Sequence, residues 1–357
     1  MTYESERDAF AERAFGSALG YFDVLSAHLG MRLGLYETLA GSDGLTSQEL
    51  ATRAGITERY AREWLEQQTT RGVLRADLTT SPARFTLPAA HAEVLLDRES
   101  AFYRGAGIGQ LVSIRHAIDQ IVQAFRTGDG VPYDAYGTEN VEGQGYSNRP
   151  LLLTTLPNEW LPSIPAVHAR LGSDPPAHVV DIGSGAGWSS IAIATAYPEV
   201  TVDGFDADPA SVEHARANAA DAGLADRVRF HAADAATAGA AGPIDFAVAI
   251  ECVHDMARPV DALRGVRGAL APDGRMLIVD ERTRDSFTGE PDDLEAYFYG
   301  WSVFNCLPAG MFDRPSEETG TVMRAETLHG YAERAGFGSF QVLPIEHDMF
   351  RLYLLGA

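Results

Sequence analysis

The stretch AIECVHDMARPV, residues 249–260, begins as a buried strand and then reaches four side chains that can bind, titrate or ligate: Glu251, Cys252, His254 and Asp255. Ionisable side chains at the carboxyl end of a strand lie where open α/β sheets bind their ligands. An imidazole has an unperturbed pKa of about 6.5, which suits a general base near neutral pH. We therefore expect a ligand-binding site here, and His254 is the residue in it whose chemistry suits a base.

Two further carboxylates, Asp280 and Glu281, close the next predicted strand, APDGRMLIVDE at residues 271–281. Adjacent parallel strands bring their carboxyl ends to one edge of a sheet, so one of these carboxylates is expected to orient the imidazole of His254. Asp255 is the other candidate for holding the imidazolium. The alternative interpretation is that His254 is a satisfied polar residue near a strand end, without a catalytic role.

A glycine-rich turn stands earlier, between a β-branched run and an apolar helix. In HVVDIGSGAGWSSIAIATAYP, residues 178–198, an acidic residue precedes glycines at alternate positions: Asp181, Gly183, Gly185 and Gly187. Such glycines let the backbone turn tightly and approach a ligand, and the following helix N-terminus offers unpaired N–H groups. The turn is therefore a candidate ligand-binding loop.

Acidic residues also end the next two predicted strands. Asp206 ends the first, roughly 20 residues beyond the glycines, where an acidic side chain can hold ribose hydroxyls. Asp234 ends the second. The alternation of strand, turn and helix predicts an α/β fold with a Rossmann-like doubly wound, mostly parallel sheet and helices on both faces. FQVLPI and MFRLYLL near the C-terminus have hairpin spacing and are expected to add an antiparallel edge.

Residues 45–75 have the pattern of two helices joined by a turn, and Thr46 with Glu49 forms a plausible capping box. The runs VLRAD and RFTLP follow as two short strands, which predicts a winged helix. Its second helix balances glutamates with arginines, so it has no net positive charge to meet DNA phosphates. For this domain, a role in dimerisation and in lining one side of a substrate site is favoured over binding to operator DNA.

Two segments carry candidate substrate contacts. Residues 127–150 are rich in glycine, tyrosine and asparagine and are too long for a simple connector, which favours a lid or binding loop. Residues 297–312, YFYGWSVFNCLPAGMF, add aromatic side chains and are expected to close over the substrate. A solvated loop whose tyrosines pack on the domain beneath is the alternative for the first segment. The candidate contacts are Tyr146, Arg149, Trp301, Asn305 and Met311.

Composition limits the class of protein. With 357 residues, 45% of them hydrophobic, the chain is long enough for two domains. The net charge of −22 disfavours nucleic acid and anionic membranes as partners and favours a small-molecule substrate. No stretch resembles a signal peptide or reaches the roughly 18 apolar residues of a membrane span. Two cysteines make no disulfide framework, and a cytoplasmic location is expected.

Residues 177–281 resemble a class I S-adenosylmethionine-dependent methyltransferase. Together with the predicted winged helix, the whole chain is similar to the two-domain, homodimeric small-molecule methyltransferases of plant O-methyltransferase type. It is also similar to their actinobacterial relatives, which act in secondary metabolism. The resemblance implies a seven-stranded methyltransferase sheet and three parts: a dimerisation domain (1–100), a helical linker and lid (101–165) and a cofactor domain (166–357).

The resemblance also implies a cofactor site. Gly183 and Gly185 would line the methionine part of S-adenosylmethionine, Asp206 would accept the ribose hydroxyls, and Asp234 would receive the adenine amino group. The cofactor is a cation, which suits the nearby carboxylates, and S-adenosylhomocysteine would be the product. The full set of cofactor candidates is Asp181, Gly183, Gly185, Gly187, Asp206, Ala207, Asp234, Ala235 and Glu251.

In such enzymes a His-Asp pair after the fourth strand supplies the base, which implies a catalytic set of His254, Asp255 and Glu281 and transfer to oxygen. A similar group methylates carbon beside a 2-oxo acid with a metal held by two histidines, but Asn305 stands 51 residues after His254, where the second would be expected. A metal is therefore possible but not favoured. Cys252 or Cys306 would offer softer ligands beside His254, but two inert core thiols are the favoured interpretation. A ligand-sensing transcription regulator is the rival from another class.

Overall fold

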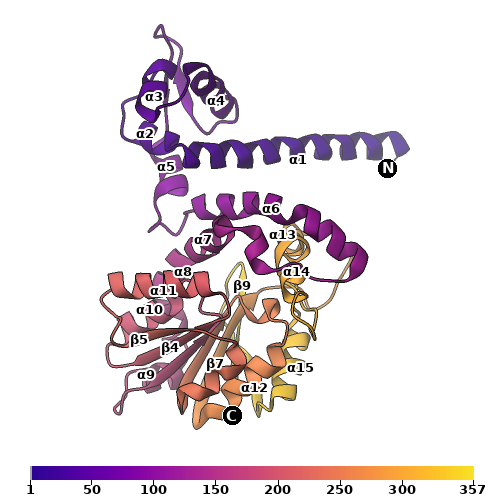
Figure 1. Cartoon of the computed structure of the whole chain (residues 1–357). Coiled ribbons are helices and arrows are strands. Elements are labelled where there is room, and N and C mark those ends of the chain that lie inside the picture. Colours follow the sequence, from indigo (N-terminus) through magenta and orange to yellow (C-terminus); the bar gives the residue numbers. More distant parts are fainter. Residues whose placement is uncertain (1) are drawn as a thin grey trace. The chain divides into compact units, whose positions relative to one another are not determined.

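The computed structural model describes residues 2–357, and the chain divides into two compact units (Figure 1). Unit 1 comprises the chain up to Ser113 together with Glu142–Ser147, and unit 2 comprises Ile114–Val141 together with Asn148–Ala357. The segment 101–165, expected to be a separate linker and lid, thus contributes to both units. Within residues 2–357, no helix combines the length and the apolar character that crossing a membrane requires.

Unit 1 is a helical domain with a two-stranded sheet. Its helices are α1 (Tyr3–Arg32), α2 (Leu35–Ala40), α3 (Ser47–Ala54), α4 (Glu58–Thr70), α5 (Ala89–Leu96) and the beginning of α6 (Gly105–Thr127). The strands β1 (Arg75–Asp77) and β2 (Arg84–Thr86) pair antiparallel, as the sequence predicted for the wing. The predicted capping box is also present, because Thr46 and Glu49 each accept a hydrogen bond from the other's backbone amide at the start of α3.

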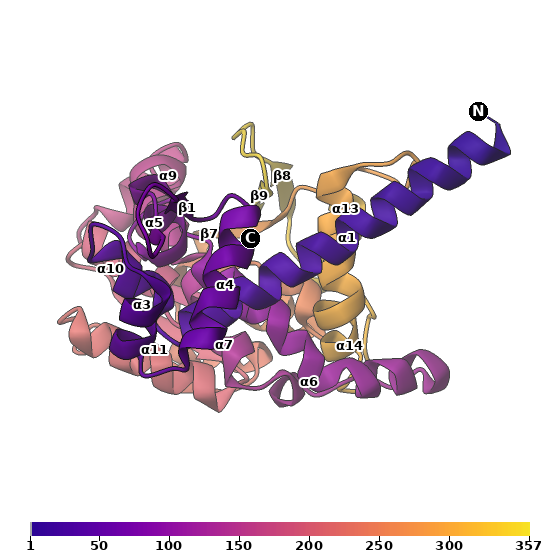
Figure 2. The same cartoon turned by 90° about the horizontal axis from the view of Figure 1, so that it is seen from above.

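Helix α1 takes little part in the core of unit 1. Leu35, Tyr36, Leu50 and Trp64 belong to that core, whereas among the described residues of α1 only Gly30 is buried. A side chain at Gly30 would meet the rings of Trp64 and Tyr36 at 2.6 Å, so glycine is needed for this close approach. The rest of α1 extends away from α3 and α4 in both views (Figures 1 and 2).

Unit 2 is built on a seven-stranded sheet with the order β5-β4-β3-β6-β7-β9-β8. The pairs from β5 to β7 are parallel, whereas β9 runs antiparallel to β7 and to β8, so the predicted doubly wound fold with an antiparallel edge is confirmed. The strands are β3 (His178–Ile182), β4 (Thr201–Asp206), β5 (Val228–Ala232), β6 (Ile244–Ile250), β7 (Leu270–Glu281), β8 (Ser339–Val342) and β9 (Phe350–Gly356).

Helices cover both faces of this sheet (Figure 1). Successive strand residues point to opposite faces, so Val179 and Val248 enter one apolar cluster while Val180 and Ile278 enter the other. The α-helices that follow α6 are α7 (Thr138–Ser147), α8 (Arg149–Thr155), α9 (Pro165–Leu171), α10 (Trp188–Ala196), α11 (Pro209–Asp221), α12 (Pro259–Ala269), α13 (Asp293–Trp301), α14 (Leu307–Gly310) and α15 (Ala325–Ala335). Short helices of other types are η1 (Tyr133–Tyr136), η2 (Leu156–Trp160), η3 (Ala235–Ala241), η4 (Val253–Asp255) and η5 (Ser302–Cys306).

The segment 127–150 differs from expectation because most of it is helical, in η1, α7 and the start of α8. One of its glycines explains why. A side chain at Gly143 would lie 2.6 Å from Cβ of Gln110, so this glycine lets α7 pack closely on α6 within unit 1. Glycine in this segment serves close packing, which the sequence pattern did not distinguish from a flexible loop.

Candidate active site

The carboxyl ends of β3, β4, β6 and β7 meet at one edge of the sheet. Asp181 of β3 is paired with Gly204 of β4 and with Val248 of β6, and Ile250 of β6 is paired with Val279 of β7. The glycine turn, Asp206, Glu251, the His-Asp pair and Glu281 all follow directly from these strand ends. The parallel topology therefore gathers the chemistry-bearing residues that the sequence singled out.

The three glycines of the turn differ in what surrounds them. A side chain at Gly183 would lie 2.5 Å from Cβ of Cys252, and one at Gly187 would lie 2.6 Å from the ring of Phe230. Nothing lies within 4 Å of the same position at Gly185. All three have positive φ angles, of 63°, 50° and 82° along the chain. Gly183 and Gly187 are thus required for packing, whereas Gly185 faces open space in which a ligand can approach the backbone.

Asp181, which was expected to contact the cofactor, uses its carboxylate for hydrogen bonds within the protein. It is buried, and its Oδ2 accepts hydrogen bonds from the hydroxyls of Ser189 at 2.5 Å and Ser190 at 2.6 Å. Burial raises the pKa of Asp181 to about 6, against the opposing effect of these hydroxyls. These hydrogen bonds connect the first turn of α10 to the end of β3 and so stabilise the conformation of the glycine turn between them.

Asp206 links the turn to the end of β4. Its two carboxylate oxygens accept hydrogen bonds from the amides of Gly185 at 2.8 Å and Asp208 at 2.9 Å. Burial raises the pKa of Asp206, and the two amides oppose that effect. Each oxygen keeps a second lone pair, so the residue retains acceptor capacity for ligand hydroxyls. Ala207, the next residue, is exposed.

Asp234 caps η3, which begins at Ala235. One of its oxygens accepts from the amide of Ala236 and the other from the guanidinium of Arg258, both at 2.9 Å. Its side chain is 49% exposed. The carboxylate predicted to receive an adenine amino group is therefore already paired with Arg258, a partner that the sequence did not indicate.

Glu251 follows β6 in a left-handed backbone conformation, with φ of 49°. Such a conformation costs free energy for a non-glycine residue and is frequent at functional sites. The amide of Asn148 donates a hydrogen bond to its carboxylate. Burial raises the pKa of Glu251 to about 8, outweighing the charge of His254. Glu251 thus belongs to the same buried group of charges as the His-Asp pair.

His254 lies in η4 and is 2% exposed. Its Nδ1 donates a hydrogen bond to Oδ1 of Asp280 at 2.7 Å. Glu281, the expected orienting residue, places Oε2 3.1 Å from the same nitrogen, but that oxygen has no aligned hydrogen bond. Asp280 is therefore the carboxylate that sets the tautomer of His254, whereas burial raises the pKa of Glu281 well above its ordinary value.

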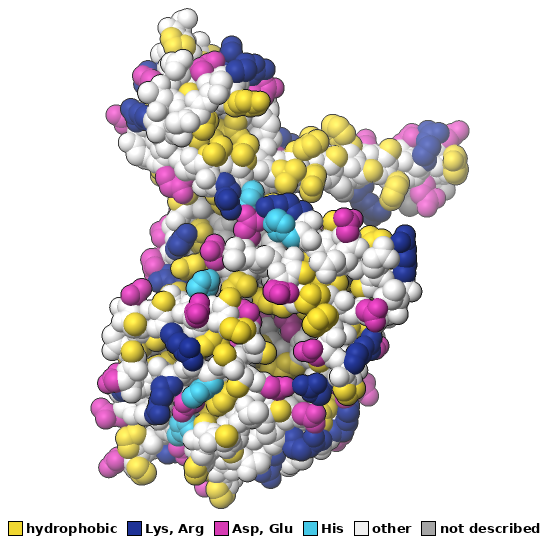
Figure 3. Space-filling view, viewed as in Figure 1, with side chains coloured by type: hydrophobic (Ala, Val, Ile, Leu, Met, Phe, Trp, Pro, Cys, Tyr) yellow, Lys and Arg dark blue, Asp and Glu magenta, His cyan; other side chains and the backbone are white. Residues whose placement is uncertain are grey.

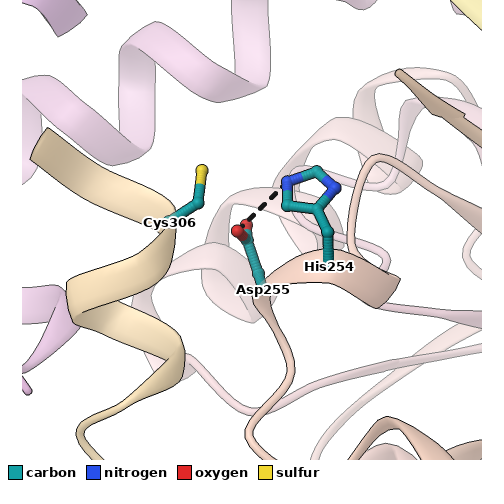
Figure 4. Close-up of side chains that lie close together, drawn as sticks. All are labelled: His254, Asp255 and Cys306. Atoms are coloured by element: carbon teal, nitrogen blue, oxygen red, sulfur yellow. Dashed lines mark ion pairs between the residues drawn. The ribbon is translucent and has the colours of Figure 1, made fainter. Parts of the chain in front are cut away.

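The other ring nitrogen of His254 faces Asp255 and Cys306 (Figure 4). Nε2 lies 3.1 Å from Oδ1 of Asp255. Burial opposes a charged imidazole, but Asp280, Glu281 and Asp255 together outweigh it and raise the pKa of His254 well above its ordinary value. The arrangement therefore stabilises the protonated form of the ring.

The predicted substrate contacts lie in both units. Tyr146 is in unit 1, 4.6 Å below the guanidinium of Arg98, and Arg149 in unit 2 lies over the ring of Trp188. Trp301 ends α13, Asn305 is buried in η5, and Met311 is half-buried after α14. The last three thus share one continuous helical segment of unit 2.

One residue near these contacts was not found from the sequence. Asn140 in α7 is fully buried, and its Oδ1 accepts a hydrogen bond from Asn305 at 3.2 Å. Tyr136 also donates to the backbone oxygen of Asn305, at 3.5 Å. Asparagine is common in loops, and a partner 165 residues away leaves no local signal in the sequence.

Comparison with known families identifies two parts of the chain. Residues 173–309 match a family described as a methyltransferase domain, and residues 23–97 match the Rv2258c-like winged HTH domain. A tRNA1(Val) (adenine(37)-N6)-methyltransferase of Porphyromonas gingivalis is 41% identical over 64 residues, which are 17% of this chain. The chain spans about a quarter of that relative's length, 25%.

Solved structures share the fold over almost the whole chain. The mitomycin 7-O-methyltransferase MmcR is 21% identical, with 99% of this chain and 100% of that chain covered and a TM-score of 0.74. An O-methyltransferase family protein from Burkholderia thailandensis is 17% identical, with 100% and 98% covered and a TM-score of 0.72. Human N-acetylserotonin methyltransferase, solved in complex with SAM, is 16% identical, with 97% of each chain covered and a TM-score of 0.65.

Proposed function

We propose that this chain, which carries a match to a methyltransferase domain and one to a winged HTH domain, moves a methyl group from S-adenosylmethionine to an oxygen atom of a small-molecule acceptor. The observation that carries the choice of oxygen is the buried His254, whose Nδ1 donates to Asp280 at 2.7 Å. A hydroxyl is a weak nucleophile until its proton is removed, and this imidazole is held in the tautomer that accepts a proton at Nε2.

The residues at the sheet edge fit S-adenosylmethionine. Gly185 leaves open space beside the backbone, and Asp206 retains acceptor capacity on both oxygens. The carboxylates of Glu251, Asp206 and Asp255 lie near one another, which favours a ligand that carries positive charge. When bound, the cofactor supplies an electrophilic methyl group on a sulfonium.

The chain's own residues would then align and deprotonate the acceptor. His254 takes the hydroxyl proton at Nε2 as the oxygen forms its bond to the methyl carbon and the carbon–sulfur bond breaks, leaving its electron pair on sulfur. Asp280 and Glu281 stabilise the imidazolium that results. Alignment of oxygen, carbon and sulfur supplies much of the rate, and the base is expected to add roughly 10² to 10⁴-fold.

The test is an assay of methyl transfer from isotope-labelled S-adenosylmethionine to a panel of phenols and other hydroxyl compounds. We expect His254→Ala to lower kcat by roughly 10² to 10⁴-fold while the affinity for S-adenosylhomocysteine stays within about twofold. The control is His347→Ala, the histidine of the chain's other His-Asp pair, whose Nδ1 accepts from the amides of Met349 and Phe350 in a turn. Wild-type rates in His254→Ala would remove this residue as the base.

We also propose that the chain forms a homodimer through α1. This helix presents aromatic side chains to solvent along much of its length, among them Phe10, Phe15 and Tyr21, each more than 60% exposed (Figure 3). Such a row of exposed aromatics favours a protein interface. Light scattering is expected to show a dimer for the full chain and a monomer for Phe15→Ser/Tyr21→Ser. A dimer in that variant would contradict the proposal.

A further inference from the structure

A second chemical property of the cluster in Figure 4 is its ability to ligate a metal ion. We propose that His254, Asp255 and Cys306 form a binding site for a thiophilic divalent cation, with Zn²⁺ as the probe. Nε2, a carboxylate oxygen and Sγ of these residues all lie within 4.8 Å of one another. Figure 4 shows the thiol and the carboxylate on the same side of the imidazole ring. The ligands come from η4 and from the π-helix η5, a helix type that is frequent at functional sites.

The relative orientation of two of these ligands supports the proposal. Nε2 of His254 and Oδ1 of Asp255 lie 3.1 Å apart, yet the pair lacks the alignment of a hydrogen bond, and Oδ1 is buried with no hydrogen-bond partner among residues 2–357. Native proteins leave few buried polar atoms unpaired. Nε2 and Oδ1 form an ion pair here, and a metal ion would replace that pairing by binding both atoms.

The opposite side of the ring is arranged as in metal sites. Nδ1 donates its proton to Asp280, so the lone pair of a neutral imidazole is on Nε2, which faces the cluster. A carboxylate that fixes the tautomer of a ligating histidine in this way is the usual companion of a metal ligand. Glu281 places a second carboxylate oxygen 3.1 Å from Nδ1, behind the imidazole.

The charge of the site also favours a cation. Asp255, Asp280 and Glu281 surround a single imidazole, and carboxylate oxygens of all three are buried without a hydrogen bond among the described residues. Buried charges are costly unless they are paired. A divalent ion would supply the missing positive charge.

The ligand types select the kind of ion. Zn²⁺ accepts nitrogen, oxygen and sulfur together and binds with three protein ligands and one open position in catalytic sites. Ligands at about 2.0 to 2.3 Å from zinc lie roughly 3.5 Å apart, so the side chains of the cluster would have to adjust around the ion. Mg²⁺ and Ca²⁺ prefer oxygen ligands alone and are not expected to compete.

The inference rests on the proposed function in one respect. Zn²⁺ would occupy the Nε2 lone pair that His254 uses to accept a proton, so bound zinc and the proposed base exclude each other. We therefore expect zinc to inhibit methyl transfer to oxygen, and a chelator to restore it.

Binding is tested by titrating zinc chloride into the full chain by calorimetry and by measuring its metal content by elemental mass spectrometry. One Zn²⁺ per chain is expected, with affinity at least tenfold lower in Cys306→Ser and in Asp255→Asn. The matched control is Cys252→Ser, because the Cys252 thiol donates to the backbone oxygen of Ile182 at 3.1 Å and lies outside the cluster. Unchanged affinity in both cluster variants, or no binding to the wild type, would overturn the site.

Activity separates the failure of this site from the failure of the proposed base. Inhibition by zinc that needs at least tenfold more metal in Cys306→Ser would support the competition between zinc and the proton. If zinc instead activates methyl transfer while the cluster variants still lose zinc binding, the proposed metal site is supported. The competition between zinc and the proton is then wrong, and so is the assignment of His254 as the base. Each variant's affinity for S-adenosylhomocysteine serves as the check that it is folded.

Discussion

Nδ1 of His254 and Oδ1 of Asp280 lie 2.7 Å apart and form a hydrogen bond that is buried at the end of β7. Glu281 follows immediately, but its carboxylate oxygen, at 3.1 Å from the same nitrogen, is not aligned to accept. Oδ1 of Asp280 also accepts a hydrogen bond from the amide of Glu281 at 3.0 Å, which fixes the Asp280 carboxylate in place. The two neighbouring carboxylates are therefore expected to contribute unequally to catalysis.

Asp280→Asn is expected to lower kcat/KM by roughly 10² to 10⁴-fold, because an amide that donates to Nδ1 would leave the proton on Nε2 and remove the base. Glu281→Gln removes charge but keeps this hydrogen bond, and a loss of about tenfold or less is expected. Steady-state kinetics on an acceptor from the hydroxyl panel would measure both. Equal losses in the two variants would contradict the assignment of Asp280 as the orienting carboxylate.

The glycine turn offers a comparison between packing and ligand approach. Alanine at Gly183 would collide with Cys252 at 2.5 Å, whereas alanine at Gly185 would meet no protein atom within 4 Å. Both positions have positive φ, so each substitution carries a conformational cost of about 1 to 2 kcal/mol. Gly183→Ala is expected to add roughly 1 to 3 kcal/mol from overpacking.

Thermal unfolding with and without S-adenosylhomocysteine would separate the two effects. Gly183→Ala should have the lower melting temperature without ligand, and Gly185→Ala should lose more of the stabilisation that the ligand gives. The reverse order would mean that Gly185 does not face the cofactor.

Asp206→Ala is expected to weaken the binding of S-adenosylhomocysteine by about 1 to 3 kcal/mol, through lost acceptors for ligand hydroxyls and a loosened amide of Gly185. Asp234→Ala is expected to cost less, because its carboxylate is already paired with Arg258 and half exposed. Calorimetry on both variants measures the difference. Equal affinity for wild type and Asp206→Ala would remove Asp206 from the site.

Much of the fold could be predicted from local patterns. Glycines, β-branched runs and the residues at strand ends indicated the α/β sheet, and the structure confirms it. Because parallel strands align their carboxyl ends, the same patterns placed His254 beside Asp280 and Glu281 before any contact was known.

The sequence was less informative where the interaction depends on distant partners. Asn140 and Asn305, or Asp234 and Arg258, meet only because separate helices pack together, and residue type alone does not signal such pairs. Residues 127–150 were expected to be a loop because glycine favours flexibility, but tertiary packing can require glycine in a helix as well.

Asp203 joins two histidines on neighbouring strands, away from the candidate active site. Its oxygens accept from Nε2 of His178 at 2.9 Å and of His231 at 2.7 Å. Burial opposes the charge on Asp203, but these hydrogen bonds outweigh it and lower its pKa to about 2, with Arg229 assisting. The hydrogen bond to Asp203 in turn raises the pKa of His178, against burial and with a smaller contribution from Asp245.

When the pKa of a histidine is higher in the folded state than in the unfolded state, its protonation stabilises the fold. This stabilisation is complete at pH values below the pKa of the unfolded state, about 6.5, and is lost as the pH rises through the pKa of the folded state. The free energy of unfolding is therefore expected to fall from pH 6 toward pH 8 in the wild type. Asp203→Asn should be less stable by roughly 1 to 2 kcal/mol at pH 6 and should lose the part of this pH dependence that His178 contributes. Urea unfolding at pH 6, 7 and 8 measures both, with His231→Gln as the control that keeps the pair between Asp203 and His178. An equal slope with pH in wild type and Asp203→Asn would show that this pair is not the source.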